Sequence, residues 1–247
     1  MKRIITALLI LLFMVSAVSC SGKESEKAES TAESETVLTT EAPKKNAVYG
    51  IDVSSFNGNI DWKKVKNDGI SFAIIRAGGR GYGEDGGLYT DKYASYNLKN
   101  AEKQRIDTGV YFFSQAISVK EAEEEAKFVK KSLNGQKIKL PVAYDVERIK
   151  GDTSRIDNVK YKDSVKYAKA FLKKITSLGY TPMVYIGEDS ILKAEDFKDY
   201  KIWYADYSKP YDSGYEILQY SKTGKVKGIN SNVDLDVMYR AKKSSAN

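Results

Sequence analysis

Short apolar runs rich in β-branched residues alternate with longer polar stretches from about residue 48 to residue 239 of this 247-residue chain. Each run is too short for a helix and is bounded by turn-forming or charged residues, which favours buried strands. The runs predict eight strands, at residues 48–53, 71–77, 108–114, 140–147, 181–186, 202–207, 215–221 and 233–239.

Amphipathic stretches separate the first five predicted strands, at residues 61–68, 91–105, 119–133 and 159–178. The last has lysines on one face and an apolar stripe on the other, formed by Val159, Val165, Ala168, Phe171, Leu172 and Ile175. Strands that alternate with helices predict a parallel sheet with right-handed crossovers. The later connections are too short for helices. We therefore expect an α/β fold, a modified TIM-like barrel of eight strands that is wrapped by helices over its first two thirds only.

The first 20 residues have the pattern of an export signal. Lys2 and Arg3 precede an apolar stretch, residues 4–18, which is short for a transmembrane helix and has the charge order of a secretory signal peptide. The segment ends in Ala-Val-Ser-Cys, similar to the lipobox of bacterial lipoproteins, although Ala17 stands where Leu is usual. We expect acylation of Cys20 and an extracytoplasmic, membrane-anchored lipoprotein. The alternative is an ordinary signal peptide of a secreted protein.

Residues 21–47 are predicted to form a disordered tether ahead of a catalytic domain at residues 48–247. The tether has no aromatic residue and too little apolar surface to fold. Its six Glu and four Lys give a net charge of −2, which Lys2 and Arg3 offset, so the domain carries the chain's whole net charge of +7. Such an excess suits an anionic partner: wall polymer, membrane surface or nucleic acid. Because no nucleic-acid-binding signature is present, we expect no nucleic-acid partner.

Composition excludes several kinds of catalytic site. The chain has no His, so Ser-His-Asp and Cys-His nucleophile systems and His-ligated zinc sites are unavailable. Its single Cys, Cys20, lies outside the predicted domain, which leaves no disulfide and no thiol nucleophile there. Carboxylate, Lys and Tyr side chains remain for acid–base work. A hydrolase built from these is most simply a glycosidase, whose usual equipment is two carboxyl groups.

Asp145 and Glu147 end the fourth predicted strand, residues 140–147. Residues i and i+2 of a strand point to the same face, so the two carboxyl groups should share one patch at the carboxyl end of a strand, where α/β barrels place their chemistry. Repulsion between them raises one pKa and leaves one group protonated as a general acid. The alternative is a pair of solvated charges at the start of a loop.

Polar and aromatic residues stand at the rim end of nearly every predicted strand, which is typical of a cleft that stacks on sugar rings and hydrogen-bonds their hydroxyls. Taken singly, the aromatic residues could equally be core residues, and Asp206 and Asp61 could be structural. Beside Asp145 and Glu147, the predicted site residues are Asp52, Arg76, Tyr111, Phe113, Tyr185, Trp203, Asp206, Gln219 and Asp234.

A set of motifs in a fixed order makes this chain similar to the family-25 glycoside hydrolases, the lysozyme (N-acetylmuramidase) family, over about residues 48–239. The motifs are Gly50-Ile51-Asp52-Val53-Ser54, Ile74-Ile75-Arg76-Ala77, Gly109-Val110-Tyr111, Tyr144-Asp145-Val146-Glu147, Trp203-x-Ala205-x-Tyr207, Gln219-Tyr220 and Val233-Asp234-Leu235. The resemblance implies a modified barrel of eight strands and about five helices, (β/α)5(β)3. One departure is visible: many relatives carry a His after the Tyr that Tyr111 matches, and this chain has Phe112.

The resemblance also implies cleavage of the β-1,4 bond between N-acetylmuramic acid and N-acetylglucosamine in peptidoglycan. Glu147 matches the general acid, Asp145 its partner, and Asp52 and Asp234 the other two acidic positions. It implies attack by the substrate's own 2-acetamido group, with retention of configuration, and no metal or cofactor. We expect a monomer that acts on glycan strands. Two alternatives stay open: a chitinase-like or endo-N-acetylglucosaminidase barrel, and a non-catalytic wall-binding lipoprotein.

Overall fold

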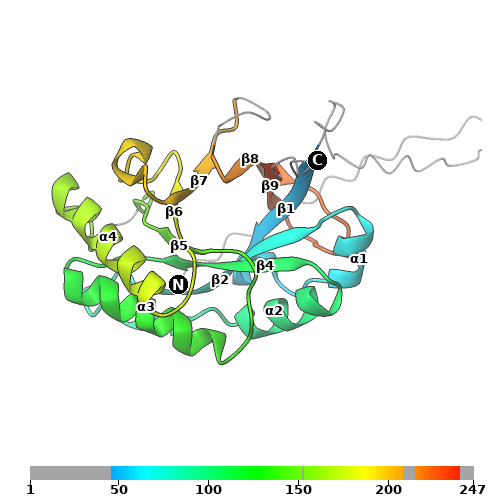
Figure 1. Ribbon diagram of the computed structural model, residues 1–247, viewed down its shortest axis with the longest axis horizontal. Helices are drawn as coiled ribbons and strands as arrows, with labels where there is room; N and C mark the ends of the chain where they lie inside the picture. Colours follow the sequence, from blue (N-terminus) through cyan, green and yellow to red (C-terminus); the bar gives the residue numbers. More distant parts are fainter. Residues whose placement is uncertain (1–45, 152, 209–214, 240–247) are drawn as a thin grey trace, which may run out of the picture. The chain divides into compact units, whose positions relative to one another are not determined.

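The computed structural model describes residues 46–151, 153–208 and 215–239 (Figure 1). All eight predicted strands are present, and a short extra one, β3, pairs with the end of β2. The predicted signal peptide and all of the predicted tether before residue 46 lie outside the described residues. The strands are β1 (Ala47–Val53), β2 (Phe72–Arg80), β3 (Leu88–Thr90), β4 (Asp107–Phe113), β5 (Val142–Asp145), β6 (Pro182–Ile186), β7 (Lys201–Ala205), β8 (Ile217–Gly224) and β9 (Val233–Tyr239).

The strands close into a barrel, as predicted. Eight of them follow the order β1-β9-β8-β7-β6-β5-β4-β2, and β1 pairs with β2 to complete the ring. Six neighbouring pairs are parallel, but β9 runs antiparallel to both β1 and β8. The first residues of β9 therefore lie at the rim where the other strands end, and Asp234 is paired directly with Asp52.

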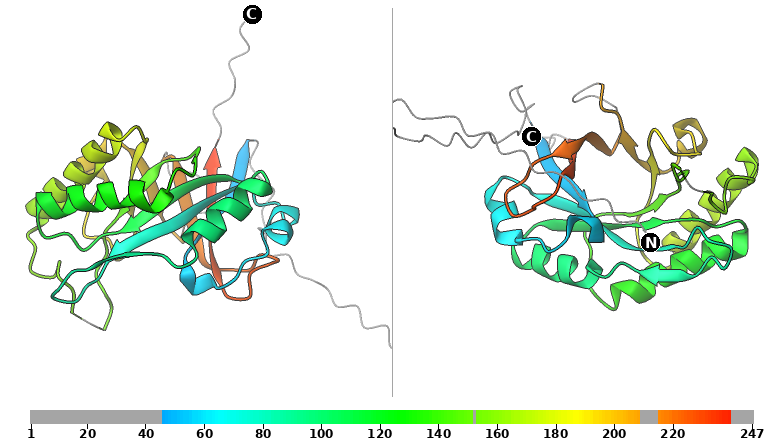
Figure 2. Two further views of the ribbon diagram at one scale, coloured as in Figure 1. Left: turned by 90° about the horizontal axis from the view of Figure 1, so that it is seen from below. Right: turned by 180° about the vertical axis from the view of Figure 1, so that it is seen from behind.

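Among the described residues, four α-helices cover the outer face of the barrel beside its earlier strands, and none lies against β7, β8 or β9 (Figures 1 and 2). Where a fifth helix was expected, between β6 and β7, the chain forms a short 3₁₀ helix. Ser190, in the same connection, forms an isolated antiparallel β-bridge with Glu147. The helices are α1 (Trp62–Asn67), α2 (Ala94–Lys103), α3 (Val119–Leu133) and α4 (Tyr161–Ser177), with 3₁₀ turns η1 (Ser55–Asn57) and η2 (Ala194–Phe197).

Alternation along the strands fills the barrel and also builds its rim. The interior of the barrel is filled by a layer of inward-facing apolar side chains, which include Phe72, Ile74, Ala143, Met183, Trp203 and Ile217. Because side chains alternate with period two, the next inward positions up the same strands carry polar groups at the rim. Gly50 leaves the space that the Phe72 ring occupies, since a Cβ there would lie 2.3 Å from the nearest ring atom.

A second apolar layer lies between the outer face of the sheet and the helices. It contains outward-facing strand residues such as Ile75 and Val184, packed with helix residues such as Leu98, Ala126 and Phe171. Within the part of the chain that the structure describes, no helix is both long and apolar enough to cross a membrane. The two packed layers fix the positions of the strand ends, on which the candidate site is built.

Candidate active site

A polar cleft opens at the barrel rim where the parallel strands end. It consists of two adjoining hollows of about 250 Å³ and about 490 Å³. All the predicted site residues except Asp206 line one or both. The side chains common to both hollows are Asp52, Tyr111, Asp145, Glu147, Lys222 and Asp234.

Asp145 and Glu147 lie where β5 meets the rim. Asp145, the last residue of β5, is 5% exposed, and its Oδ1 has no hydrogen-bond partner among the described residues. Glu147 is partly exposed to the cleft, and its backbone is held by the bridge to Ser190. The deeper carboxyl group thus sits beside one that a ligand in the cleft could reach.

The electrostatic environment keeps both groups protonated to higher pH than usual. Burial, and then repulsion by Asp189 and Asp234, raises the pKa of Glu147 to about 7, although Lys150 opposes the shift. Burial also raises the pKa of Asp145 well above its ordinary value, with repulsion from Glu147 added. We expected Asp145 to be the charge that raises the pKa of Glu147. Repulsion between these two carboxyl groups is present and contributes to the raised pKa of Asp145. At Glu147 the charges of Asp189 and Asp234 contribute as well, which sequence spacing could not indicate.

Gln219 positions Asp52 through a hydrogen-bond network. The Gln219 side-chain amide donates to Asp52 Oδ2 at 2.6 Å, and its carbonyl oxygen accepts from the hydroxyls of Tyr185 at 3.1 Å and Tyr207 at 2.8 Å. Burial, followed by repulsion from Asp236 and Asp234, raises the pKa of Asp52 well above its ordinary value. Tyr207 and Gln219 therefore order the wall of the cleft opposite β5.

Trp203 forms the floor of the cleft. It is 2% exposed, its ring meets Tyr185 edge-on at 4.8 Å between centroids, and Tyr111 lies 5.9 Å away. Its indole N–H donates to Asp236 Oδ1 at 2.8 Å. Asp236 is fully buried and was not predicted as a site residue. Its signal in the sequence is the spacing Asp234-x-Asp236, which places both carboxyl groups on the inner face of β9.

Arg76 anchors the other end of the cleft. Its guanidinium donates to Asp91 Oδ2 and to Ser55 Oγ, each at 2.8 Å, and stacks 5.0 Å from the centre of the Phe56 ring. Phe56 is 84% exposed and lines the same hollow as Arg76 and Phe113. Because its exposed ring lines the cleft, Phe56 is a candidate sugar-stacking surface that sequence reasoning did not identify.

Asp206, which was predicted as a binding residue, is not among the residues that line either hollow, although its neighbour Tyr207 is. Its Oδ1 accepts from the backbone N–H and the hydroxyl of Ser208, at 2.9 and 2.7 Å, and so fixes the turn after β7. Lys222 was also missed; it lies within 3.4 Å of a Glu188 carboxyl oxygen and over the Tyr207 ring. Among the described residues, no three His, Cys, Asp or Glu side chains are grouped to hold a metal ion.

The arrangement is suited to acid–base cleavage of a glycosidic bond. A partly exposed carboxyl group with a pKa of about 7 can deliver a proton near neutral pH and take one back. A buried carboxyl group beside it can bind the reacting part of a sugar. Tyrosine hydroxyls and exposed aromatic surface complete a site of sugar-binding character.

Comparisons with known proteins agree with this chemistry. The family model described as glycosyl hydrolases family 25 matches residues 51–229. An uncharacterized Escherichia coli K12 protein, YegX, is 29% identical over 208 residues, which cover 79% of this chain and 71% of YegX. An autolytic lysozyme from Clostridium acetobutylicum is 28% identical over 190 residues, covering 76% of this chain and 54% of that protein.

Solved structures show the same fold. The modular autolysin LytC of Streptococcus pneumoniae superposes with a TM-score of 0.67 at 28% identity, covering 80% of this chain and 48% of that one. A family 25 glycosyl hydrolase from Bacillus anthracis gives a TM-score of 0.67 at 24% identity, covering 82% of this chain and 93% of that one. The chain thus spans about half the length of the pneumococcal autolysin and of the clostridial lysozyme. Because the family model covers most of the barrel, the chain belongs to glycosyl hydrolase family 25 and is a glycoside hydrolase.

Proposed function

We propose that this protein is a muramidase that hydrolyses the β-1,4 bond between N-acetylmuramic acid and N-acetylglucosamine in peptidoglycan. The observation that carries the proposal is Glu147, a partly exposed acid with a pKa of about 7 beside the buried Asp145. Two similar proteins support the substrate class. One is named an autolytic lysozyme, and the pneumococcal autolysin has been solved in complex with a synthetic peptidoglycan ligand.

In the first step Glu147 protonates the departing glycosidic oxygen. The 2-acetamido oxygen of the muramic ring attacks its own anomeric carbon as the bond to that oxygen breaks, which forms a cyclic oxazolinium ion. Asp145 accepts a hydrogen bond from the acetamido N–H and stabilises the positive charge that develops on the ring. Asp52 and Asp234 hold Asp145 and the sugar in place.

In the second step a water molecule attacks the anomeric carbon and opens the cyclic ion. Glu147, now ionised, takes a proton from that water and returns to its starting state. Each proton that Glu147 gives in the first step is thus recovered in the second. The reaction needs one group that titrates near neutral pH, and the surroundings of Glu147 meet that requirement.

Product analysis tests the bond that is cleaved. Mass spectrometry of the fragments released from defined peptidoglycan should find N-acetylmuramic acid at the new reducing ends. Reducing-end N-acetylglucosamine would instead indicate an endo-N-acetylglucosaminidase, and chitin fragments released from chitin would indicate a chitinase-like enzyme. Purified sacculi that are bound but never lysed would identify a non-catalytic wall-binding protein.

The stereochemistry of the product tests the nucleophile. Two successive displacements at the anomeric carbon retain configuration, so proton NMR of the first turnovers should show the β-anomer first. No glycosyl ester should be trapped on Asp52, Asp145 or Asp234. An initial α-anomer would mean single displacement by water and would overturn the acetamido mechanism.

We further propose that the protein is a lipoprotein anchored through Cys20, which lies outside the described residues. If residues 21–47 form the tether predicted from their composition, its root-mean-square reach would be roughly 25–30 Å, which would let the cleft work on glycan close to the membrane. The acyl chains usual for such a Cys hold a protein to the membrane because each buried CH₂ contributes about 0.8 kcal/mol. The domain's positive charge adds attraction to anionic surfaces.

Cell fractionation tests this location. Wild-type protein should sediment with membranes, whereas Cys20→Ala should not be lipidated and should leave the membrane fraction. Activity on soluble glycan should be unchanged, because the residues that line the cleft all lie between Asp52 and Asp234 in the sequence. Ser21→Ala, which keeps the Cys, is the matched control. Wild-type protein found mainly in the medium, with a mature N-terminus beyond Cys20, would contradict the lipoprotein proposal.

A further inference from the structure

Four lysines recur along the outer face of α4 and form what we call the lysine row. They are Lys162, Lys166, Lys169 and Lys173. Their spacing is i, i+4, i+7 and i+11, which places them within one narrow face of a helix. At 1.5 Å per residue the row is about 16 Å long, and the Cβ atoms of successive lysines are roughly 5–6 Å apart.

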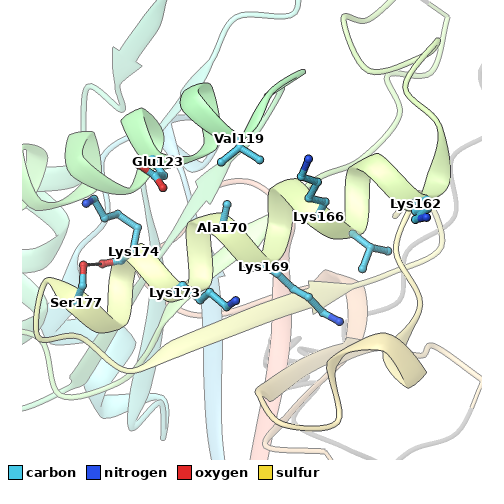
Figure 3. Close-up of a pocket in the computed structure, with 10 residues that line it drawn as sticks. Val119, Glu123, Lys162, Lys166, Lys169, Ala170, Lys173, Lys174 and Ser177 are labelled. Carbon is cyan, nitrogen blue, oxygen red and sulfur yellow. Dashed lines mark hydrogen bonds between the residues drawn. The ribbon is translucent and has the colours of Figure 1, made fainter.

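The row lines a groove between α3 and α4 (Figure 3), which we call the lysine groove. Its cavity measures about 650 Å³. Lys174 adds a fifth ammonium group, and Glu123 of α3 is the one acidic side chain in the lining. The remaining lining residues are Val119, Val165, Ala170 and Ser177.

Among the described residues, these lysines form no ion pair, since none of the five lies within 4.0 Å of a carboxylate oxygen. The one charge contact is the Lys169 ammonium over the Phe197 ring at 5.7 Å. The helix is held to the barrel by its opposite face, through residues such as Phe171 and Ile175. Like charges four residues apart repel and destabilise a helix, so the row opposes folding unless something neutralises it.

The lysine groove is separate from the cleft. The two share no lining residue, and the groove runs along the outside of the barrel while the cleft opens at its rim. A ligand in the groove therefore leaves the cleft free. The groove's role is independent of which glycosidic bond the cleft cleaves.

We propose that the lysine groove binds a linear polyanion with phosphodiester charges at regular spacing, the chemistry of anionic bacterial wall polymers. Ammonium groups repeated along one helix beside a groove match a chain that carries one negative charge every few ångströms. A membrane surface is matched less well, because Tyr161 is the one large hydrophobic residue of α4 that is highly exposed, and interfacial helices present an apolar face to lipid. Binding there would retain the enzyme on wall material while its cleft acts on glycan.

Binding of fluorescently labelled long-chain inorganic polyphosphate to the purified full-length chain tests the proposal. The variant Lys162→Gln/Lys166→Gln/Lys169→Gln/Lys173→Gln should bind at least about tenfold more weakly at low salt. Its plot of log affinity against log salt should be shallower by about 3, from four lost contacts at about 0.7 each. Glutamine is a good helix former, so α4 should persist in circular dichroism.

A matched control removes the same charge elsewhere. Lys63, Lys99, Lys103 and Lys225 are exposed and line neither the cleft nor the lysine groove. Their fourfold replacement by Gln should weaken binding by no more than about twofold to threefold, through net charge alone. Equal loss in both variants would show a diffuse charge effect and overturn the proposal.

Two further arms complete the test. Glu123→Lys removes the one negative charge of the lining and should tighten polyphosphate binding, and this result does not depend on the fourfold variant folding. Vesicles of phosphatidylglycerol serve as the alternative ligand. If the groove variant loses vesicle binding but keeps polyphosphate binding, the surface is a membrane contact and the proposal is wrong. Failure of the wild type to bind polyphosphate would overturn it as well, whatever its hydrolytic activity.

Discussion

Glu147→Gln is expected to abolish hydrolysis of peptidoglycan fragments while the barrel stays folded. The amide has nearly the same shape as the carboxyl group but cannot protonate the departing oxygen or take a proton from water. Loss of general acid catalysis lowers kcat by at least about 100-fold. The loss should be in kcat more than in KM, because the missing interaction forms in the transition state.

Glu102→Gln supplies a matched control, since Glu102 is an exposed residue of α2 away from the cleft. It makes the same chemical change and should leave kcat unaltered. Circular dichroism of both variants should equal that of the wild type. If Glu147→Gln keeps more than about a tenth of the rate with an unchanged spectrum, Glu147 is not the acid, since a general acid contributes about 100-fold or more.

The sequence was sufficient to predict the barrel because hydrophobic runs mark buried strands, and eight such runs occur, the first five of them separated by amphipathic stretches. It missed β3, whose three residues, Leu88–Thr90, are partly or fully exposed and so leave no apolar run. That strand forms because β2 continues through Gly78 and Gly79, whose lack of a Cβ lets Tyr89 approach closely. Such an extension depends on contact between segments rather than on either segment alone.

The direction of β9 could not be predicted from the strand–helix alternation. In an all-parallel barrel the first residues of the last strand would lie at the opposite end from the cleft, and Asp234 would be far from Glu147. Antiparallel pairing with β1 and β8 brings Asp234 to the rim instead. The prediction of Asp234 as a cleft residue therefore rested on its place at the end of a strand and on the family resemblance, not on a predicted strand direction.

The candidate site was predictable where residues are close in sequence and not where they are distant. The spacing of Asp145 and Glu147 follows from the period of a strand. The hydrogen bonds from Gln219 to Asp52 and from Trp203 to Asp236 join residues 167 and 33 positions apart. Their geometry depends on closure of the whole barrel. The composition of each strand end therefore predicts which polar residues lie at the rim, but not which of them form hydrogen bonds with one another.

The buried carboxyl groups in and beneath the cleft lower the stability of the folded protein when they are ionised. Asp52, Asp145 and Asp236 are buried, and burial raises the pKa of each well above its ordinary value. A raised carboxyl pKa means that the folded state disfavours the ionised form relative to the unfolded chain. The stability of the protein should therefore fall as pH rises from the ordinary carboxyl range to the raised values.

Glu147→Gln is accordingly expected to stabilise the protein in a pH-dependent way. Below about pH 4.5, the ordinary Glu value, Glu147 is protonated in both the folded and the unfolded chain, so its replacement should change stability little. Between there and about pH 7 the unfolded chain loses the proton first, which destabilises the folded wild type. The difference between the two pKa values corresponds to about 3 kcal/mol in the free energy of unfolding. Because Glu147 is partly exposed to water, we expect roughly 2 kcal/mol.

Urea denaturation at about pH 3.5, a unit below the ordinary Glu value, and at about pH 8.5 measures this difference. The variant should match the wild type at the lower pH and exceed its unfolding free energy by roughly 2 kcal/mol at the higher one. Glu102→Gln should show no such dependence, since its side chain is exposed. Equal stability of variant and wild type at both pH values would mean that Glu147 is ionised in the fold as easily as in water. That outcome would remove the physical basis for assigning Glu147 as the acid. The desolvation that destabilises the folded protein when Glu147 is ionised also keeps the catalytic proton on Glu147 near neutral pH.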